Sequence, residues 1–322
     1  MVTGVPAHGP IGIVGAGSIG VAFAVVFARA GFAVRVWDAL PDAAPRARDE
    51  LAHRLYILGL SADVADRVSF EDDLAVALRD VVLVQECAPE RIALKRELFA
   101  RIAAAAPPTA VLASSSSALL PTAIAEELDD AHAARLIVAH PGNPPYLLPV
   151  IELVAGARTA PSTVGEAAAL YGAAGLRPVR VNREIDGFVF NRLQGAVLRE
   201  AYCLVRDGVA SVEDVDEVVR SGLGRRWSII GPFETVDLNT RGGIASHAEK
   251  MGPAYAAMGA ERGQHDPWMP DLVAAVVAQR RDILPEEDWA ARVRWRDAQL
   301  ARLAPIWDAI REGSPDTEEG HR

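Results

Sequence analysis

The 322-residue chain has few cysteines and no excess of basic residues, and each shortage excludes a class of protein. Its two cysteines, Cys87 and Cys203, lie too far apart for a disulfide framework or a metal-binding spacing, so we expect both to be small core residues of a reduced, cytoplasmic protein. The 33 basic and 43 acidic side chains give a formal net charge of −10, which disfavours nucleic acid and anionic membranes as partners. The seven histidines show no ligand spacing such as H-x-x-x-H, so no metal site is expected.

One long uncharged run, Ile11–Ala28, has the length of a membrane span. Four glycines in its first ten residues and the return to charge at Arg29 argue against a span. A signal peptide is not expected either, because no basic region precedes the run and no cleavage-type pattern follows it. The run is typical of a buried strand that leads through a turn into a helix.

The turn within this run has the pattern G-x-G-x-x-G, from Gly15 to Gly20. Gly15 permits a tight turn, Gly17 leaves room for a pyrophosphate, and Gly20 lets the helix pack close to the strand. The N–H groups at the helix start, at Ser18 and Ile19, attract phosphate. The next apolar run, 33–37, ends in Asp38, where an acid binds the ribose 2′-hydroxyl of NAD and repels a 2′-phosphate. The stretch predicts an NAD site.

Short apolar runs alternate with helical patterns over the first half of the chain. This alternation predicts an α/β fold with an N-terminal Rossmann-type doubly wound sheet. Strands are expected at 11–14, 33–37, 68–70, 81–85, 111–113, 136–139, 150–154 and 179–181, and helices at 21–30, 41–60, 72–78, 90–106 and 162–172.

From Gly187 onward the sequence predicts only helices, so we expect an all-α C-terminal domain. The first of these helices spans 188–205, and Ser211–Asp214 resembles a capping box that begins another. The predicted domains are 1–186 and 187–322, with a polar, disordered tail after 311. The apolar residues available for burial in the first helix are Phe188, Leu193, Val197, Leu198 and Leu204.

Several polar residues follow predicted strands, at the edge of the sheet where ligands bind. The run Ser114–Ser117 is one; alone, it would more often be a solvated loop. His140 begins a proline-rich loop, and Glu152 lies among apolar neighbours, where a carboxylate needs a partner. If the two strands that flank this loop pair antiparallel, Glu152 can meet His140 and stabilise its charged form. Otherwise Glu152 is a carboxylate that reaches water at a strand end.

A set of motifs is similar to the 3-hydroxyacyl-CoA dehydrogenase superfamily: GAGSIG, the serine run, HPGNPP, the glutamate of VIELV, and GFVFNRL. Five longer segments resemble its lambda-crystallin or L-gulonate 3-dehydrogenase branch, in order, from residue 11 to about residue 258. These segments are QECAPE, ASSSSALLPT, IVAHPGNPPY, GFVFNRLQ and GLGRRWSIIGPFET.

The resemblance implies a role for each matching residue. His140 would be the catalytic acid/base and Glu152 its charge partner. Ser117 and Asn191 would form hydrogen bonds to the reacting oxygen of the substrate. On its own, Asn191 would be an ordinary polar residue in the first turn of a helix. Arg226 would hold a substrate carboxylate, and the helical domain would form a homodimer. The remaining expected cofactor contacts are Glu90, Lys95, Ser117 and Asn143, the first two near the nicotinamide ribose.

The resemblance further implies NAD-dependent interconversion of an L-3-hydroxy acid and its 3-keto acid, with a free, L-gulonate-like acid as substrate. The alternative is a 3-hydroxyacyl-CoA thioester. The segment 39–79 is short and lacks lysine, and Pro141-Gly142 stands where CoA-using members tend to have aromatic residues, so the thioester is disfavoured. A biosynthetic ketoreductase on a specialised keto acid and a non-catalytic structural protein stay open.

Overall fold

The computed structural model describes residues 9–228, 231–232, 235 and 243–263, with shorter stretches between 271 and 309. The chain divides into two compact units, Met1–Leu193 and Gln194–Arg322. The first unit contains an eight-stranded sheet, whereas the described residues of the second form helices and turns. The division falls inside one helix, α8 (Phe190–Arg206).

The sheet of the first unit has the strand order β3-β2-β1-β4-β5-β6-β7-β8. All neighbouring strands are parallel except β6 and β7, which pair antiparallel. Because β2 and β4 lie on opposite sides of β1, the strand order reverses there, and ligands bind open α/β sheets at such a reversal. The strands are β1 (Ile11–Val14), β2 (Val34–Trp37), β3 (Val68–Glu71), β4 (Leu83–Glu86), β5 (Val111–Ser114), β6 (Leu136–Pro141), β7 (Val150–Ala155) and β8 (Arg177–Val181).

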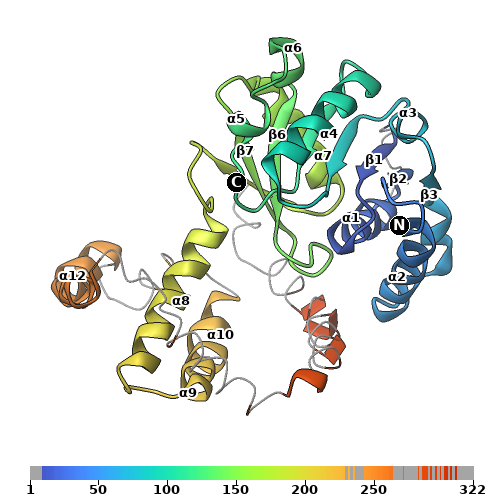
Figure 1. Cartoon of the computed structure of the whole chain (residues 1–322). Helices are drawn as coiled ribbons and strands as arrows, with labels where there is room; N and C mark the ends of the chain where they lie inside the picture. The colour runs from blue at the N-terminus through green and yellow to red at the C-terminus, as the bar shows by residue number, and fades with distance from the viewer. Residues whose placement is uncertain are drawn as a thin grey trace, which may run out of the picture. The chain divides into compact units, whose positions relative to one another are not determined.

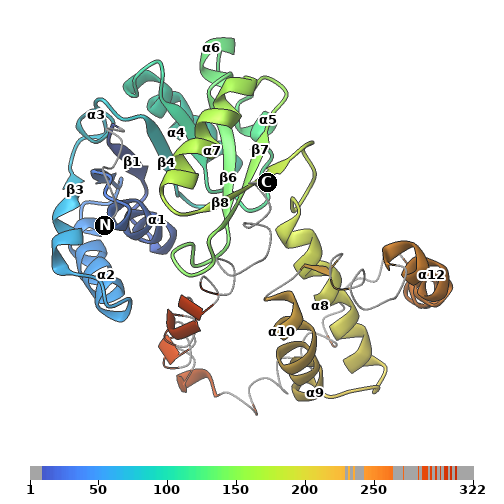
Figure 2. The same ribbon diagram turned by 180° about the vertical axis from the view of Figure 1, so that it is seen from behind.

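Helices cover both faces of this sheet (Figures 1 and 2). One face packs against α1 (Ser18–Arg29), α2 (Ala43–Ile57) and α7 (Pro161–Ala173), around Phe23 and Tyr171. The other packs against α3 (Leu74–Ala77), α4 (Ile92–Ala105), α5 (Pro121–Ile124) and α6 (Asp130–Ala133), around Phe99. Because helices cover both faces, β1, β4 and β5 are buried along their whole length, including the polar residues at the ends of β4 and β5.

The predicted Rossmann-type α/β sheet is therefore confirmed. The condition on which the proximity of His140 and Glu152 depended is met, because β6 and β7 pair antiparallel and the two residues are directly opposite in register. The sequence did not predict a 3₁₀ helix at Ala62–Arg67 or the short helices α5 and α6.

The described part of the second unit is helical, as predicted. After α8 it contains α9 (Val212–Glu217), a π-helical segment (Val218–Leu223), α10 (Gly224–Trp227), α12 (Gly243–Arg262) and a 3₁₀ turn (Glu286–Asp288). The predicted capping box is present, since the hydroxyl of Ser211 accepts from the N–H of Asp214 at 3.1 Å. The predicted tail after residue 311 lies outside the described residues.

The apolar residues available for burial in α8 are buried to different extents within one chain. Phe188 is buried and precedes the helix, whereas Leu193 is 58% exposed. Val197 and Leu198 are exposed as well, and Leu204 is half-buried. An amphipathic pattern identifies the apolar face of a helix but not the surface that covers it.

No helix in the described residues is both long and apolar enough to cross a bilayer.

Candidate active site

The turn after β1 has the geometry that its three glycines predict. Gly15 has a φ of +108°, and a Cβ there would lie 2.9 Å from the backbone of Cys87. A Cβ on Gly20 would lie 1.8 Å from the carbonyl oxygen of Gly15, so only glycine lets α1 pack this close to the turn. A Cβ on Gly17 would meet nothing within 4 Å. The space above Gly17 is open where a phosphate would approach the backbone.

The N-terminus of α1 begins at this open space. Within the described residues, no side chain caps it, so its first N–H groups are available to an anion. Asp38, at the end of β2, lies beside the turn, and its two carboxylate oxygens accept from the N–H of Ala16 at 2.7 Å and of Leu40 at 2.9 Å. These bonds fix the carboxylate at the strand end while each oxygen keeps a further lone pair for a ribose hydroxyl.

A cavity of about 590 Å³ runs from the glycine turn past Asp38 to α4. Trp37 forms part of its wall, with the guanidinium of Arg101 over the indole ring at 5.3 Å. Cys87 also lines it, and burial, followed by the charge of Glu86, raises the pKa of its thiol, so the thiol stays protonated. The unobstructed backbone of Gly17, the uncapped N-terminus of α1 and the fixed carboxylate of Asp38 all line one cavity, and together they fit a dinucleotide.

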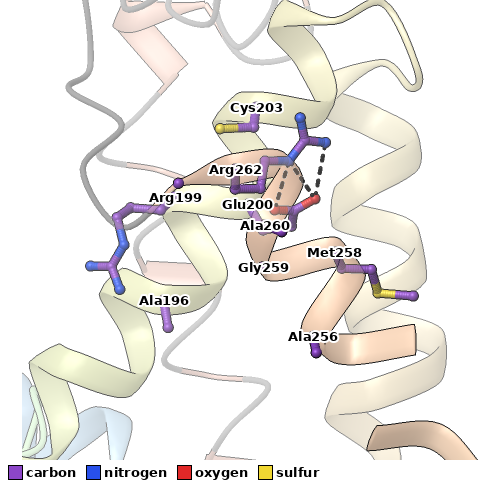
Figure 3. A pocket seen from close by; sticks show the side chains of 10 residues that line it. Ala196, Arg199, Glu200, Cys203, Ala256, Met258, Gly259, Ala260 and Arg262 are labelled. Atoms are coloured by element: carbon purple, nitrogen blue, oxygen red, sulfur yellow. Dashed lines mark hydrogen bonds and ion pairs between the residues drawn. The ribbon is translucent and has the colours of Figure 1, made fainter. Parts of the chain in front are cut away.

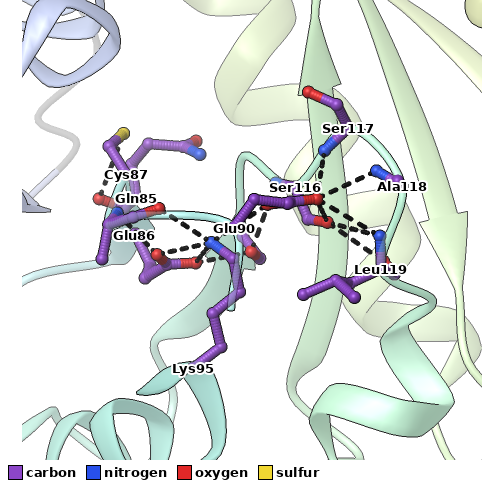
Figure 4. A network of polar contacts seen from close by, with 11 residues as sticks. Gln85, Glu86, Cys87, Glu90, Lys95, Ser116, Ser117, Ala118 and Leu119 are labelled. Carbon is purple, nitrogen blue, oxygen red and sulfur yellow. Dashed lines mark hydrogen bonds and ion pairs between the residues drawn. The ribbon is translucent and has the colours of Figure 1, made fainter. Parts of the chain in front are cut away.

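A buried ion pair supports the strand end beside this cavity (Figure 4). The ammonium of Lys95, on α4, lies 2.8 Å from both carboxylate oxygens of Glu86, and both side chains are fully buried. The Ser114 hydroxyl donates to the same carboxylate at 2.5 Å and the N–H of Ala88 at 2.6 Å. The pair thus joins β4, β5 and α4 below the site. Lys95 contacts Glu86, Ala88 and Glu90 here, and its expected contact with the nicotinamide ribose stays a prediction.

Glu90 organises the serine loop (Figure 4). Its Oε1 accepts from the Ser116 hydroxyl. The same oxygen accepts from three backbone N–H groups, those of Ser117 and Ala118 at 3.0 Å and that of Leu119 at 3.3 Å. Burial by itself would raise the pKa of Glu90, but the hydrogen bonds from Ser116 and the backbone, with the charge of Lys95, hold it below its ordinary value. An ionised Glu90 therefore fixes the loop that carries Ser117.

His140 and Glu152 form a buried pair. Nδ1 of His140 lies 2.7 Å from Oε2 of Glu152. The other oxygen of Glu152 accepts from the N–H groups of Val189 at 2.7 Å and Phe190 at 2.9 Å. Burial would raise the pKa of Glu152, but the bonds from His140, Phe190 and Val189 outweigh it and lower that pKa. Glu152 is therefore ionised and held from both sides.

Other expected site residues lie around this pair. The amide of Asn191 donates to the carbonyl of Ser117 at 3.0 Å, which links the start of α8 to the serine loop. The rings of Phe188 and Phe190 lie 5.6 Å and 6.1 Å from the imidazole of His140 and shield it from water. The first unit thus brings together His140, Glu152, Ser117 and Asn191.

Two further expected residues are placed less fully. Asn143 is exposed in the loop between β6 and β7. Arg226 belongs to α10 in the second unit, and its side chain lies outside the described part of the structure. Among the described residues, no cluster of three or more His, Cys, Asp or Glu side chains could hold a metal ion.

The second unit has a hollow of its own, of about 720 Å³, between α8 and α12 (Figure 3). Arg262 lines it and donates to the carboxylate of Glu200 at 3.1 Å and to that of Asp207 at 2.5 Å. Cys203 lines it as well. These ion pairs neutralise the charge of Arg262, and Arg199 lines the same hollow.

Sequence reasoning missed Glu86, Trp37 and the bonds that Glu90 makes to the serine loop. A signal for Glu86 was present, because a carboxylate inside the apolar strand of 81–86 requires a buried partner. No signal identified that partner as Lys95, since the pair joins a strand to a helix nine residues away.

The Rossmann sheet and its open glycine turn define a dinucleotide-dependent enzyme. Residues 10–185 match the family described as "3-hydroxyacyl-CoA dehydrogenase, NAD binding domain", and residues 187–282 match "3-hydroxyacyl-CoA dehydrogenase, C-terminal domain". The chain belongs to the 3-hydroxyacyl-CoA dehydrogenase family and is an NAD-dependent oxidoreductase that acts on CH–OH groups. The predicted family and cofactor are thus confirmed.

Relatives described by different names match most of the chain. Lambda-crystallin of Oryctolagus cuniculus is 38% identical over 319 residues, covering 94% of this chain and 97% of that protein. L-carnitine dehydrogenase of Streptomyces griseus is 42% identical over 252 residues, covering 77% of this chain and 75% of that protein. One similar solved structure is that of a 5-formyl-3-hydroxy-2-methylpyridine 4-carboxylic acid 5-dehydrogenase, described as an NAD⁺-dependent dismutase. It is 30% identical, with a TM-score of 0.80, and the match covers 94% of this chain and 99% of that chain.

Proposed function

We propose that the chain interconverts a free L-3-hydroxy acid and its 3-keto acid, with His140 and Glu152 as the acid/base pair. The observation that carries the proposal is the 2.7 Å contact between Nδ1 of His140 and a buried, ionised carboxylate of Glu152. An ionised carboxylate only accepts hydrogen bonds, so Nδ1 carries the hydrogen and the lone pair of the neutral imidazole lies on Nε2.

In the oxidation direction, Nε2 of His140 removes the hydroxyl proton of the substrate. NAD, when bound at the glycine turn, would supply the acceptor for the hydride of the carbon that carries this hydroxyl, so that a carbonyl forms. His140 then carries a positive charge, which the carboxylate of Glu152 stabilises at 2.7 Å. Phe188 and Phe190 keep water from the ring. In the reduction direction His140 returns the proton.

Ser117 and Asn191 stabilise the negative charge that develops on the substrate oxygen. Their mutual hydrogen bond of 3.0 Å, together with the bonds of Glu90 to the serine loop, orients both residues before substrate binds. Preorganised donors of this kind each contribute on the order of 10²-fold to the rate. The Ser117 hydroxyl and the second N–H of the Asn191 amide thus act on the oxygen whose proton His140 removes.

A free acid is favoured over a CoA thioester. The lambda-crystallin and L-carnitine dehydrogenase relatives support this choice, as does the lysine-free segment 39–79. Arg226 supplies the cation that binds the substrate carboxylate in this proposal.

The test is NAD-dependent absorbance at 340 nm with L-gulonate, L-3-hydroxybutyrate, L-carnitine and 3-hydroxybutyryl-CoA. Turnover of a free acid, with none of the thioester, is the expected result, and Arg226→Met should then raise the KM for that acid. Preference for the thioester would overturn the free-acid assignment. Absence of turnover with every compound, while NADH still binds, would favour the non-catalytic alternative or an untested keto acid.

We also infer that the helical unit forms a homodimer. The apolar residues Leu193, Val197 and Leu198 leave one face of α8 exposed, and a second copy would cover such a face. Light scattering should give twice the 34.3 kDa mass of the chain, and Leu193→Glu should shift it toward that of the monomer.

A further inference from the structure

Arg54 is a buried arginine whose role the family assignment leaves open. It lies near the C-terminal end of α2, and its side chain is 8% exposed, whereas Arg46 and Arg48 of the same helix are exposed. Its guanidinium donates to the carbonyl oxygen of Ser18 at 2.7 Å, to the Ser18 hydroxyl at 2.9 Å and to Glu50 at 2.7 Å. An arginine from α2 thus holds one residue of α1 at two points.

The residue that it holds stands at the NAD site. Ser18 is the first residue of α1, beside the open backbone of Gly17, and it lines the cavity of about 590 Å³. It also lines a second hollow, of about 440 Å³, which extends to Arg54. Ser18 is exposed, so its hydroxyl can reach a ligand at the helix start.

The hydrogen bond from Arg54 fixes the direction of the Ser18 hydroxyl. The oxygen accepts from the guanidinium, so its own hydrogen is free to donate. A hydroxyl that accepts from a cation is polarised and becomes a stronger donor. At the start of α1 this donor adds to the uncapped N–H groups, and all of them favour the same anion.

Arg54 also reaches the loop that follows the strand of His140. Its guanidinium lies over the ring of Tyr146, 5.5 Å from the ring centre. Tyr146 is tied to α1 as well, because Arg29 donates to its carbonyl oxygen at 2.8 Å. Arg54 therefore packs between the glycine turn and the loop between β6 and β7.

We propose that Arg54 is a positioning residue of the NAD site, which acts through Ser18 to orient a hydroxyl donor toward the cofactor pyrophosphate. The bidentate fork to the carbonyl and hydroxyl of one serine is a geometry that a lysine cannot reproduce. The proposal depends on NAD binding and is independent of which hydroxy acid is the substrate.

The test measures binding to the substrate-free protein. NADH affinity is determined by fluorescence titration, and ADP-ribose and adenosine are titrated as competitors. Arg54→Met should weaken NADH and ADP-ribose roughly tenfold, the loss expected for one charge-assisted hydrogen-bonding arrangement. Adenosine, which has no phosphate, should bind as it does to the unmodified protein. The affinity of Arg54→Lys for NADH and ADP-ribose should lie between that of the unmodified protein and that of Arg54→Met.

Two further variants separate a positioning role from general distortion. Arg48→Met removes an exposed arginine of the same helix that lines neither hollow, and it should leave all three affinities unchanged. Ser18→Ala should give the same pattern as Arg54→Met, and the double variant should be no weaker than the weaker single variant. Ser18→Ala provides this test even if Arg54→Met fails to fold.

Three results would overturn the proposal. One is unchanged NADH affinity in Arg54→Met or Ser18→Ala. Another is an equal loss for adenosine and ADP-ribose, which would indicate a distorted adenosine site. The third is a double variant whose loss is the product of the two single losses, since Arg54 would then act without Ser18.

Discussion

Nδ1 of His140 lies 2.7 Å from Oε2 of Glu152, at paired positions of the two antiparallel strands in an otherwise parallel sheet. If β7 ran parallel to β6, the loop would have to cross the sheet, and a contact within 12 residues would be excluded. The short antiparallel connection therefore brings a carboxylate to the ligand-binding edge.

His140→Ala should lower turnover by about 10²-fold or more, because it removes the proposed general base. NADH affinity should be unchanged, since His140 is absent from the lining of the cavity beside the glycine turn. Steady-state rates and NADH titration check this result. His132→Ala, which changes a histidine bonded to Asp129 on the surface, is the matched control. More than about a tenth of the original rate in His140→Ala would contradict the assignment.

Glu152→Gln should change how stability depends on pH. The pKa of Glu152 in the folded protein lies below its ordinary value of 4.5, so below about pH 4.5 the unfolded chain binds more protons and the free energy of unfolding falls. The gap in Tm between the protein and Glu152→Gln should therefore be widest near neutral pH and narrow from about pH 4.5 downward. Melting curves between about pH 3 and 7 test this, with the exposed Glu166→Gln as control. A constant gap would refute it.

Asp38→Ala should relax the preference for NADH over NADPH. The carboxylate is fixed beside the turn by the N–H groups of Ala16 and Leu40, where its charge repels a 2′-phosphate. Titration with both cofactors gives the ratio of affinities. The nearby Asp42→Ala, which changes an exposed acid paired with Arg46, should leave the ratio as it was. An unchanged ratio in Asp38→Ala would show that another residue recognises the ribose.

Glu90→Gln should lower kcat roughly tenfold, because a neutral amide holds the serine loop more weakly than a carboxylate. The loop carries Ser117, whose N–H donates to Glu90 at 3.0 Å. Both kcat and the KM for NAD should be measured, because a loosened Ser117 is expected to lower kcat. Glu126→Gln, a change to an exposed carboxylate that pairs with Arg96, serves for comparison. The prediction fails if kcat is the same in both variants.

Lys95→Met should destabilise the fold by about 3–5 kcal/mol, because it leaves the carboxylate of Glu86 buried without its cation. Urea unfolding measures the change. The double variant Lys95→Met/Glu86→Gln should lose less than the sum of the single losses, since the lone charge is gone. Strictly additive losses would indicate that the two side chains do not interact.

The sequence predicted the parts of the fold whose physical signal is local. The runs that became β1, β4 and β5 begin with apolar residues because helices cover both of their faces, and the turn at Gly15 follows from a φ that other residues avoid. Likewise, the capping box at Ser211 depends on residues three apart.

What the sequence could not predict depends on partners distant in the chain. The strand direction of β7 was left as a condition, because a short apolar run is equally compatible with either pairing. The spacing of Leu193 in α8 makes it available for burial, yet spacing does not show which surface covers it. Helical spacing does not distinguish Arg54 from the exposed Arg46 and Arg48 of α2; only its hydrogen bonds to Ser18, 36 residues away, do.

The two N–H groups that bind Glu152 belong to Val189 and Phe190, after the last strand of the sheet. A fragment that stops at residue 186 would keep every strand and the whole glycine turn. It would nevertheless lose both backbone donors to that carboxylate, as well as Asn191 and the ring of Phe188. Such a fragment should still take up NAD yet fail as a catalyst. The sheet of this chain therefore ends before its catalytic residues do, because the sheet ends at Val181 and the proposed site extends to Asn191.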